Sequence, residues 1–160
     1  ASTGEEPYSI AITLADALGL EGRFRIWASD IDTKVLGTAA RGVYKLEGIK
    51  GLSTAQLQKY FLKGKGANAG YARVKSELQR HIDFFTLNLI QDNWALKEQF
   101  DVVFCRNVMI YFDANTQRQV LGRIHRVMKD QGTLFVGHAE NFSDARNLFA
   151  LRGKTVYEKV

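Results

Sequence analysis

One apolar run, Phe100-Asp-Val-Val-Phe-Cys105, restricts the fold more than any other part of the sequence. A nearly continuous apolar stretch of this length is typical of a strand buried on both faces of a parallel sheet. An amphipathic helix is predicted to follow it from about Asp113. The apolar residues at helical spacing are Val120, Leu121, Ile124, Val127 and Met128. Further strands are predicted at Gly132–Gly137 and Thr155–Val160. Strands and helices that alternate with short links predict an open α/β sheet.

The first part of the chain follows the same alternation. A helix is predicted from Pro7, which suits a first helical turn, to Gly19, which closes it. A strand at Phe24–Ala28 leads into the acidic stretch Ser29–Asp32, whose last residue is the expected N-cap of a short second helix. A sheet of this kind is expected to begin with a strand before the opening loop. We therefore expect residues 1–160 to be one domain that is truncated at its N-terminus.

The pattern changes over residues 42–88. The stretch Gly64–Gly70 is rich in turn-forming residues. Polar and apolar residues alternate over Tyr71–Lys75, as in a half-exposed strand, and His81–Leu87 is predicted as another strand. We therefore expect a small antiparallel insertion within this stretch, in an otherwise alternating pattern.

Composition excludes several classes of protein. Cys105 is the one cysteine, so an internal disulfide framework and a multi-cysteine metal site are both excluded. His81, His125 and His138 are too scattered to indicate a metal site, and none is expected. No apolar run approaches the roughly 20 residues that cross a bilayer, and no leader pattern is present. We expect a cytoplasmic protein that is not embedded in a membrane. The formal charge of +5 favours acidic partners without choosing among them.

Small and acidic residues gather at the expected ligand edge of the first half. The turn Ala1–Gly4 would let a ligand approach the backbone closely, and a helix N-terminus follows it. Asp30 ends the next strand, where an acid binds ribose hydroxyls in nucleotide-binding α/β folds. Glu5 and Glu6 would attract an ammonium or sulfonium group, which favours S-adenosylmethionine over NAD. Two structural interpretations stay open: Asp30 as a helix cap, and the glutamates as complements to the helix dipole.

A second group of polar residues follows the buried strand. Arg106 and Asn107 come directly after it, and Tyr111 lies a few residues further on. The carboxyl ends of strands are the ligand-binding edge of open α/β sheets. A structural ion pair of Arg106 is the alternative. Asn88 similarly stands at an apolar strand end, where it could cap a turn or bind a base edge.

Four segments together resemble the CheR-type chemotaxis protein methyltransferases. They are Ser2-Thr-Gly-Glu-Glu-Pro-Tyr-Ser9, Ala28-Ser-Asp-Ile-Asp32, Cys105-Arg-Asn-Val-Met-Ile-Tyr-Phe112 and Gly137-His-Ala-Glu-Asn-Phe142. They occur in the family's order and spacing and cover nearly the whole chain. The resemblance implies a class I, Rossmann-like S-adenosylmethionine-dependent methyltransferase fold with a small inserted antiparallel β-subdomain at residues 64–85.

The resemblance also implies residue roles. Glu6 or Glu5 would hold the methionine ammonium, and Asp30 the ribose. Asn88 and Leu89 would flank the adenine.

In the same way, Arg106 and Asn107 would line the site near the methionyl moiety, and Tyr111 would lie beside the transferring methyl. Tyr111 and Arg106 are thus the expected catalytic residues. The implied reaction forms glutamate methyl esters on chemoreceptors and leaves S-adenosylhomocysteine, without a metal.

The implied partners are the cytoplasmic helical domain of chemoreceptors and a regulatory protein, not nucleic acid. Within the insertion, Arg73 and Lys75 would attract an acidic receptor segment, although a purely structural hairpin is the alternative. Two other functions remain open. One is a non-catalytic fragment that binds a receptor or regulator. The other is a nucleic-acid methyltransferase, which the basic charge suggests. Such enzymes often carry an Asn/Asp-Pro-Pro-Tyr/Phe turn, but Pro7 is the one proline here.

Overall fold

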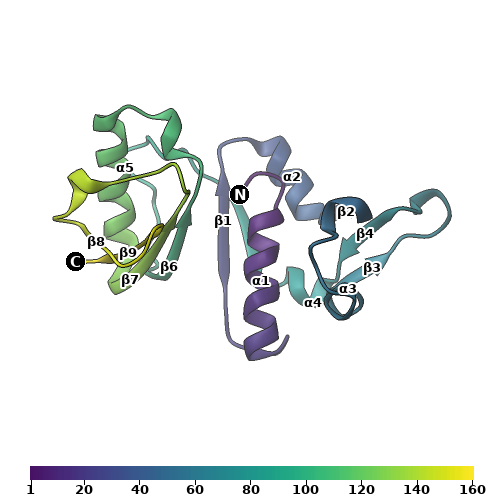
Figure 1. Cartoon of the computed structure of the whole chain (residues 1–160). Coiled ribbons are helices and arrows are strands. Elements are labelled where there is room, and N and C mark those ends of the chain that lie inside the picture. The colour runs from purple at the N-terminus through teal and green to yellow at the C-terminus, as the bar shows by residue number, and fades with distance from the viewer. The chain divides into compact units, whose positions relative to one another are not determined.

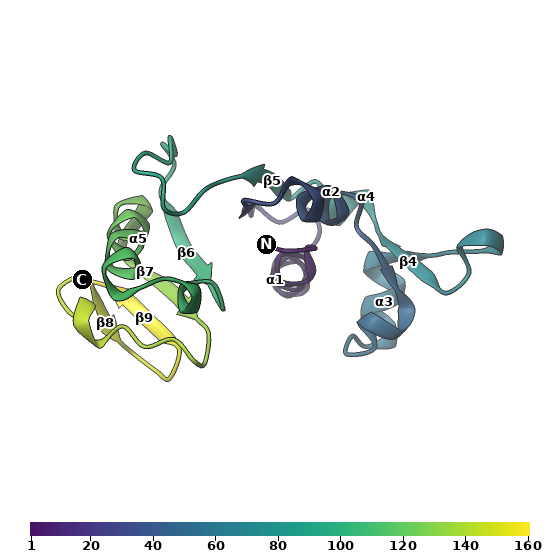
Figure 2. The same ribbon diagram turned by 90° about the horizontal axis from the view of Figure 1, so that it is seen from above.

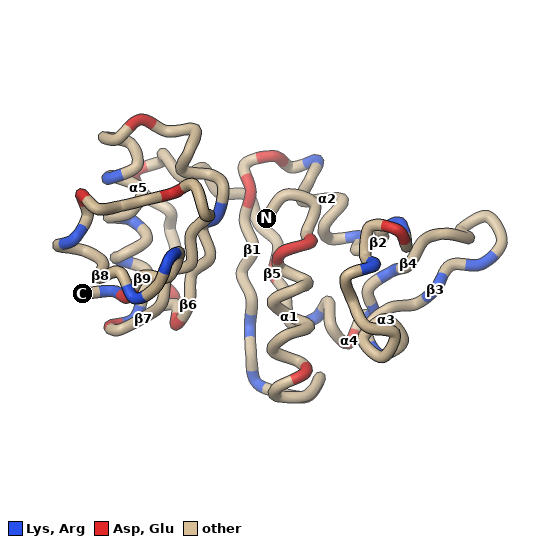
Figure 3. The backbone as a smooth tube through the Cα atoms, in the orientation of Figure 1, with Lys and Arg blue, Asp and Glu red and all other residues tan.

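The computed structural model describes residues 1–160 and divides into two compact units, Ala1–Asn88 and Leu89–Val160 (Figure 1). Each unit contains one pair of parallel strands. None of the helices is long and apolar enough to cross a membrane. Lysine and arginine are scattered along both units rather than gathered in one run (Figure 3).

The first unit is built on the parallel pair β1 (Ile26–Asp30) and β5 (Ile82–Thr86). Helix α1 (Glu5–Leu18) runs alongside β1 and is seen end-on in Figure 2. Helix α2 (Thr33–Arg41) follows β1 directly, and the Asp32 side chain caps it by accepting a hydrogen bond from the Lys34 N–H at 2.8 Å. The predicted helix–strand–helix order and the Asp32 cap are therefore confirmed.

An antiparallel sheet stands between α2 and β5 in the sequence. Its strands β2 (Val43–Lys45), β4 (Tyr71–Val74) and β3 (Phe61–Lys63) lie in the order β2-β4-β3. The remaining helices of this unit are α3 (Thr54–Tyr60), α4 (Ser76–Gln79) and the 3₁₀ turns Leu46–Ile49 and Gly66–Asn68.

The expected boundaries of the insertion, 64–85, need correction. The antiparallel sheet already begins at Val43 and ends at Val74, whereas β5 belongs to the parallel pair. Strands β2 and β3 are three residues long, too short to show the two-residue alternation that identifies a strand. Helix α4, which separates β5 from the antiparallel sheet, has four residues and no clear helical period.

The second unit is a four-stranded sheet with one helix. Strand β6 (Phe100–Cys105) pairs in parallel with β7 (Met128–Val136), and α5 (Ala114–Val127) connects them. Strands β9 (Val156–Lys159) and β8 (Phe149–Leu151) continue the sheet in the order β6-β7-β9-β8 with antiparallel pairing. The 3₁₀ turns are Met109–Tyr111 and Ser143–Ala145. The three predicted strands and the helix between the first two are confirmed, while the three-residue β8 was not anticipated.

The core of the second unit lies between this sheet and α5. Leu134 on β7 and Val120 on α5 are fully buried, and Cys105 and Val103 of β6 pack against the same cluster. Phe104 alternates with them and stacks instead on Phe135 of β7, with ring centroids 4.7 Å apart. Within this unit taken by itself, the core thus covers one face of β6.

Replacement of Leu134 by alanine should lower the free energy of unfolding by about 2–5 kcal/mol, because it leaves a cavity in this core. Leu134 is 0% exposed, whereas Leu151 in the same sheet is 59% exposed. Leu151→Ala is therefore the matched control, with an expected change within about 0.5 kcal/mol. Urea titrations of both variants measure the difference. Equal losses would contradict this assignment of the core.

Candidate functional site

The parallel pair of the first unit brings Asp30 and Asn88 to one edge. Asp30 is the last residue of β1 and stands in register with Thr86, the last residue of β5. The Leu87 N–H donates to the Asp30 carbonyl at 3.1 Å, and Asn88 follows directly. Because the strands are parallel, both carboxyl ends meet at the edge where α/β sheets bind ligands.

The opening loop folds onto the Asp30 carboxylate. The Ser2 N–H donates to Oδ2 at 2.9 Å and the Asp32 N–H to Oδ1 at 3.0 Å. The Ala1 nitrogen lies 3.5 Å from Oδ2 and donates to the Ser29 carbonyl at 2.8 Å. A carboxylate offers about four acceptor sites, so one remains on Oδ1 for a ligand hydroxyl.

These contacts set the pKa of Asp30. Partial burial raises the pKa of this carboxyl, but the N–H groups of Asp32 and Ser2, together with the charged amine of Ala1, favour the ionised form by more. The pKa of Asp30 is therefore lower than its ordinary value, and the group is ionised at neutral pH.

Two carboxylates stand in the first turn of α1, beside this loop. Glu5 is exposed and accepts a hydrogen bond from the Thr3 hydroxyl at 2.6 Å. Glu6 is half-buried. Negative charge at a helix N-terminus is favourable in itself, and the same charges suit a cationic ligand group.

Gly4 has a structural explanation that the sequence did not reveal. Its φ of +98° lies in the left-handed region, and a Cβ there would come 2.7 Å from the Tyr44 hydroxyl and 2.9 Å from the Ala39 Cβ. The Tyr44 hydroxyl also donates to the Thr3 carbonyl at 2.6 Å. Burial raises the pKa of Tyr44, and its phenol stays protonated as a donor. A small residue at position 4 is thus required for packing of the loop, whether or not a ligand approaches it.

The second unit presents its own carboxyl edge, where β6 ends at Cys105 and β7 at Val136. Arg106 and Asn107 follow β6 and are exposed, and Asn107 has a left-handed φ of 61°. Tyr111 closes the next 3₁₀ turn with 81% of its surface exposed. The three residues that were predicted together are therefore together on one loop.

Leu89 begins the second unit and packs against its core. Its carbonyl accepts hydrogen bonds from the Arg123 guanidinium at 3.1 Å and from the Trp94 indole at 3.2 Å. Arg123 is itself buried and also donates to Asp92 at 2.9 Å. The backbone at Leu89 is thus held firmly. The predicted site residues fall into two groups, one in each unit.

Glu140 is a residue whose role sequence reasoning missed. It lies in the loop after β7, is 6% exposed, and its carboxylate accepts hydrogen bonds from backbone N–H groups of two loops. An acid in a small-residue turn after an apolar strand was the signal that could have identified it. No group of three His, Cys, Asp or Glu side chains is arranged to hold a metal ion.

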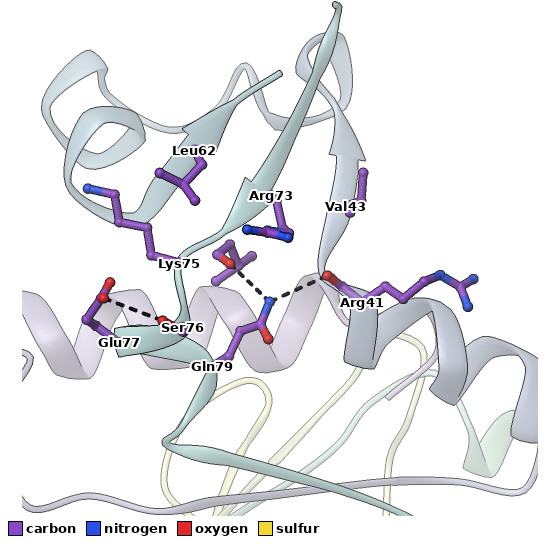
Figure 4. Close-up of a pocket in the computed structure, with 9 residues that line it drawn as sticks. Arg41, Val43, Leu62, Arg73, Lys75, Ser76, Glu77 and Gln79 are labelled. Carbon is purple, nitrogen blue, oxygen red and sulfur yellow. Dashed lines mark hydrogen bonds between the residues drawn. The ribbon is translucent and has the colours of Figure 1, made fainter. Parts of the chain in front are cut away.

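A basic cavity of about 690 Å³ opens beside the antiparallel sheet. Figure 4 shows Arg73 between Leu62 and Val43, its register partners on the neighbouring strands, with Arg41 and Lys75 directed to opposite sides. The Arg73 side chain makes no hydrogen bond or ion pair, although its backbone pairs with both neighbouring strands. Basic groups that are spread along the cavity in this way suit an extended acidic partner better than one compact anion.

Comparison with known proteins connects these features to a family. The family described as CheR methyltransferase, SAM binding domain, matches residues 1–158. The chemotaxis protein methyltransferase of Salmonella typhimurium is 53% identical over 158 residues, which are 98% of this chain and 55% of that protein. Chemotaxis protein methyltransferase 2 of Pseudomonas aeruginosa is 48% identical over 158 residues, 98% of this chain and 56% of that protein. The chain thus spans about half the length of the curated relatives it matches.

Among solved structures, the N-methyltransferase NodS from Bradyrhizobium japonicum in complex with S-adenosyl-L-homocysteine is 13% identical. It aligns with a TM-score of 0.49 over 84% of this chain and 66% of NodS, a likeness too weak to carry an argument. The parallel strand pairs and their helices confirm the predicted α/β fold, and the family match shows that it is a methyltransferase SAM-binding domain.

Asp30 should make stability depend on pH. Because its pKa is lower in the folded chain than in an unfolded one, its ionised form stabilises the fold above its ordinary pKa of about 4. That contribution is lost as the pH falls through the folded-state pKa. The free energy of unfolding of the unsubstituted protein should therefore exceed that of the Asp30→Asn variant at pH 7. The difference between the two should shrink below about pH 4. Urea titrations across this range measure it, and a constant difference would contradict the role of the carboxylate.

Proposed function

This chain belongs to the CheR methyltransferase family, in its SAM-binding domain, and we propose that residues 1–160 form the main part of the catalytic domain of a chemoreceptor methyltransferase. The enzyme would transfer a methyl group from S-adenosylmethionine to receptor glutamates, forming methyl esters. The observation that carries this proposal is the family match over residues 1–158. The paired strand ends support it, because each unit has polar residues at the edge that such folds use.

The proposed reaction needs little chemistry from side chains. When bound, S-adenosylmethionine supplies an electrophilic methyl group on a sulfonium. A glutamate with an ordinary pKa near 4.3 is already ionised at pH 7, so no residue of this chain has to act as a general base. What the chain must provide is alignment and exclusion of water, worth up to roughly 7–11 kcal/mol in well-oriented systems.

We assign the first unit to the polar ends of the cofactor. Glu5 or Glu6 binds the methionine ammonium, since both lie in the first turn of α1. Asp30 binds a ribose hydroxyl, and its free acceptor site on Oδ1 is suited to this. Asn88 and Leu89 flank the adenine. The ionised carboxylate of Asp30 suits a ribose hydroxyl, and the two glutamates in the first turn of α1 suit an ammonium group.

We assign the loop after β6 to the reacting end. Arg106 and Asn107 line the methionyl moiety, and Tyr111 stands beside the methyl group. Tyr111 and Arg106 are the residues proposed to contact the reacting groups. The exposure of Tyr111 leaves its ring accessible to a substrate.

The proposed substrate is the cytoplasmic helical domain of chemoreceptors, and the proposed location is therefore the cytoplasm. The net charge of +5 favours an acidic receptor surface. A regulatory protein is a further proposed partner. A non-catalytic module that binds a receptor or regulator is the second candidate, because the chain covers about half of its relatives' length. Calorimetry with S-adenosylmethionine on this chain and on the full-length protein separates the two.

Asp30→Ala in the full-length protein should weaken S-adenosylmethionine binding by about 1.5–3 kcal/mol, the range for a hydrogen bond to a charged group. Asp83→Ala is the matched control. Asp83 lies within β5 rather than at its end, and it pairs with Arg25 at 2.6 Å. Isothermal titration calorimetry of both variants measures the two affinities. Unchanged affinity in Asp30→Ala would remove this residue from the ribose role.

We further propose that the antiparallel sheet of residues 43–74 docks the receptor. An extended acidic segment could pair with an exposed strand edge and face the basic cavity. The Arg73 guanidinium has no internal hydrogen-bond or ion-pair partner, and Lys75 donates to the Gln58 carbonyl at 3.0 Å. The alternative is that these charges only protect strand edges from aggregation.

Reversing both charges, Arg73→Glu with Lys75→Glu, should reduce methylation of whole receptor several-fold and leave cofactor affinity intact, because docking loses its attraction. Reversal of Arg126 and Lys154 in the second unit changes the total charge equally and is the control. Receptor methylation and cofactor binding are measured separately. Equal loss of both in the Arg73/Lys75 variant would show that the sheet supports the catalytic core instead.

A further inference from the structure

We propose that Glu140 is a positioning residue for methyl transfer, which fixes the loop that carries Arg106, Asn107 and Tyr111. This inference rests on the proposed function for the meaning of those three residues. Its structural part, that one buried carboxylate determines the conformation of this loop, stands on the contacts of the second unit alone.

Three short hydrogen bonds carry the proposal. Oε1 of Glu140 accepts the Gly137 N–H at 2.7 Å and the Asn107 N–H at 2.8 Å. Oε2 accepts the Met109 N–H at 2.8 Å. The carboxylate therefore joins the loop after β6 to the loop after β7. Buried bonds to a charged acceptor are stronger than bonds between neutral groups.

The backbone around the Glu140 carboxylate is closely packed and conformationally restricted. Asn107 is held at a φ of 61°, a conformation that a side chain disfavours and that must be maintained by its contacts. A Cβ on Gly137 would lie 2.4 Å from the Asn107 Oδ1 and 2.9 Å from the Glu140 Oε1. The two loops are thus packed closely around the carboxylate.

The hydrogen bond from the Met109 N–H to Glu140 connects the carboxylate to Tyr111. Met109 begins the 3₁₀ turn that ends at Tyr111, and its side chain is fully buried. On the other side of the turn, the Gln117 amide donates to the carbonyls of Met109 at 2.8 Å and Phe112 at 3.1 Å. The Tyr111 side chain is 81% exposed, so few neighbours fix it and its position depends on the backbone of the turn.

The substitution Glu140→Gln tests whether the hydrogen bonds of this side chain matter, because glutamine has nearly the same size and shape as glutamate. Its one amide oxygen can still accept from Gly137 and Asn107, but its NH₂ group then faces the Met109 N–H, and two donors cannot bond. We expect Glu140→Gln in the full-length protein to lower kcat roughly tenfold to a hundredfold, the scale of a small misplacement at the reacting centre. The dissociation constant for S-adenosylmethionine should change less than about threefold, because Asn107, which follows Arg106 directly, keeps its bond to residue 140. Amide hydrogen exchange should lose protection at Met109 and keep it at Asn107 and Gly137.

Glu158→Gln is the matched control. It removes one carboxylate from the same unit, where Glu158 accepts from Arg152 at 3.1 Å on β9, and it should leave kcat unchanged. If Glu140→Gln does not fold, Gln117→Met removes the other anchor of the same turn without changing charge and should also lower kcat.

An unchanged kcat in a folded Glu140→Gln variant overturns the inference. So does a lower kcat with the Met109 amide still protected, or a loss of cofactor binding as large as the loss of kcat. Should the unsubstituted protein transfer no methyl group, the proposed function fails instead. The Met109 exchange pattern then still decides whether Glu140 holds the loop.

Discussion

The conformation of both candidate ligand edges depends on a carboxylate that accepts backbone N–H groups. In the first unit Asp30 accepts from Ser2 and Asp32, and in the second Glu140 accepts from Gly137, Asn107 and Met109. Loops after strands leave N–H groups without ladder partners, and such groups are costly to bury unpaired. An ionised carboxylate satisfies several of them at once, which makes the loop conformation specific.

The two carboxylates differ in whether an acceptor site remains for a ligand. Asp30 is partly exposed and retains an acceptor site on Oδ1, so it can both hold its loop and bind a ligand hydroxyl. Glu140 is 6% exposed and both of its oxygens are engaged by the surrounding backbone. The first is therefore suited to contact a cofactor directly. The second acts through the loop that it organises.

Local sequence patterns predicted the long helices and strands of the fold correctly. Helix α5 was predicted to begin near Asp113, and the Asp113 side chain is observed to cap it by accepting a hydrogen bond from the Thr116 N–H at 2.8 Å. The antiparallel sheet was misplaced because β2 and β3 are too short to show a period. The sequence suggested that Gly4 allows a ligand to approach the backbone. In the structure Gly4 lies against Tyr44, which is 40 positions away in the chain. Contacts of that range leave no local pattern.

The same limit explains why Glu140 was missed, whereas Arg106 and Tyr111 were proposed from the sequence. Arg106 and Tyr111 are conspicuous as polar groups at the end of an apolar strand, and such a position is visible in one short segment. Glu140 acts on Asn107 from 33 residues away, and its effect depends on the parallel register that sets the ends of β6 and β7 side by side. A sequence can therefore indicate polar groups at a strand end as candidates for ligand contact. The residue that holds those groups in place becomes visible once the two strands are paired, because only the pairing brings its carboxylate to their backbone.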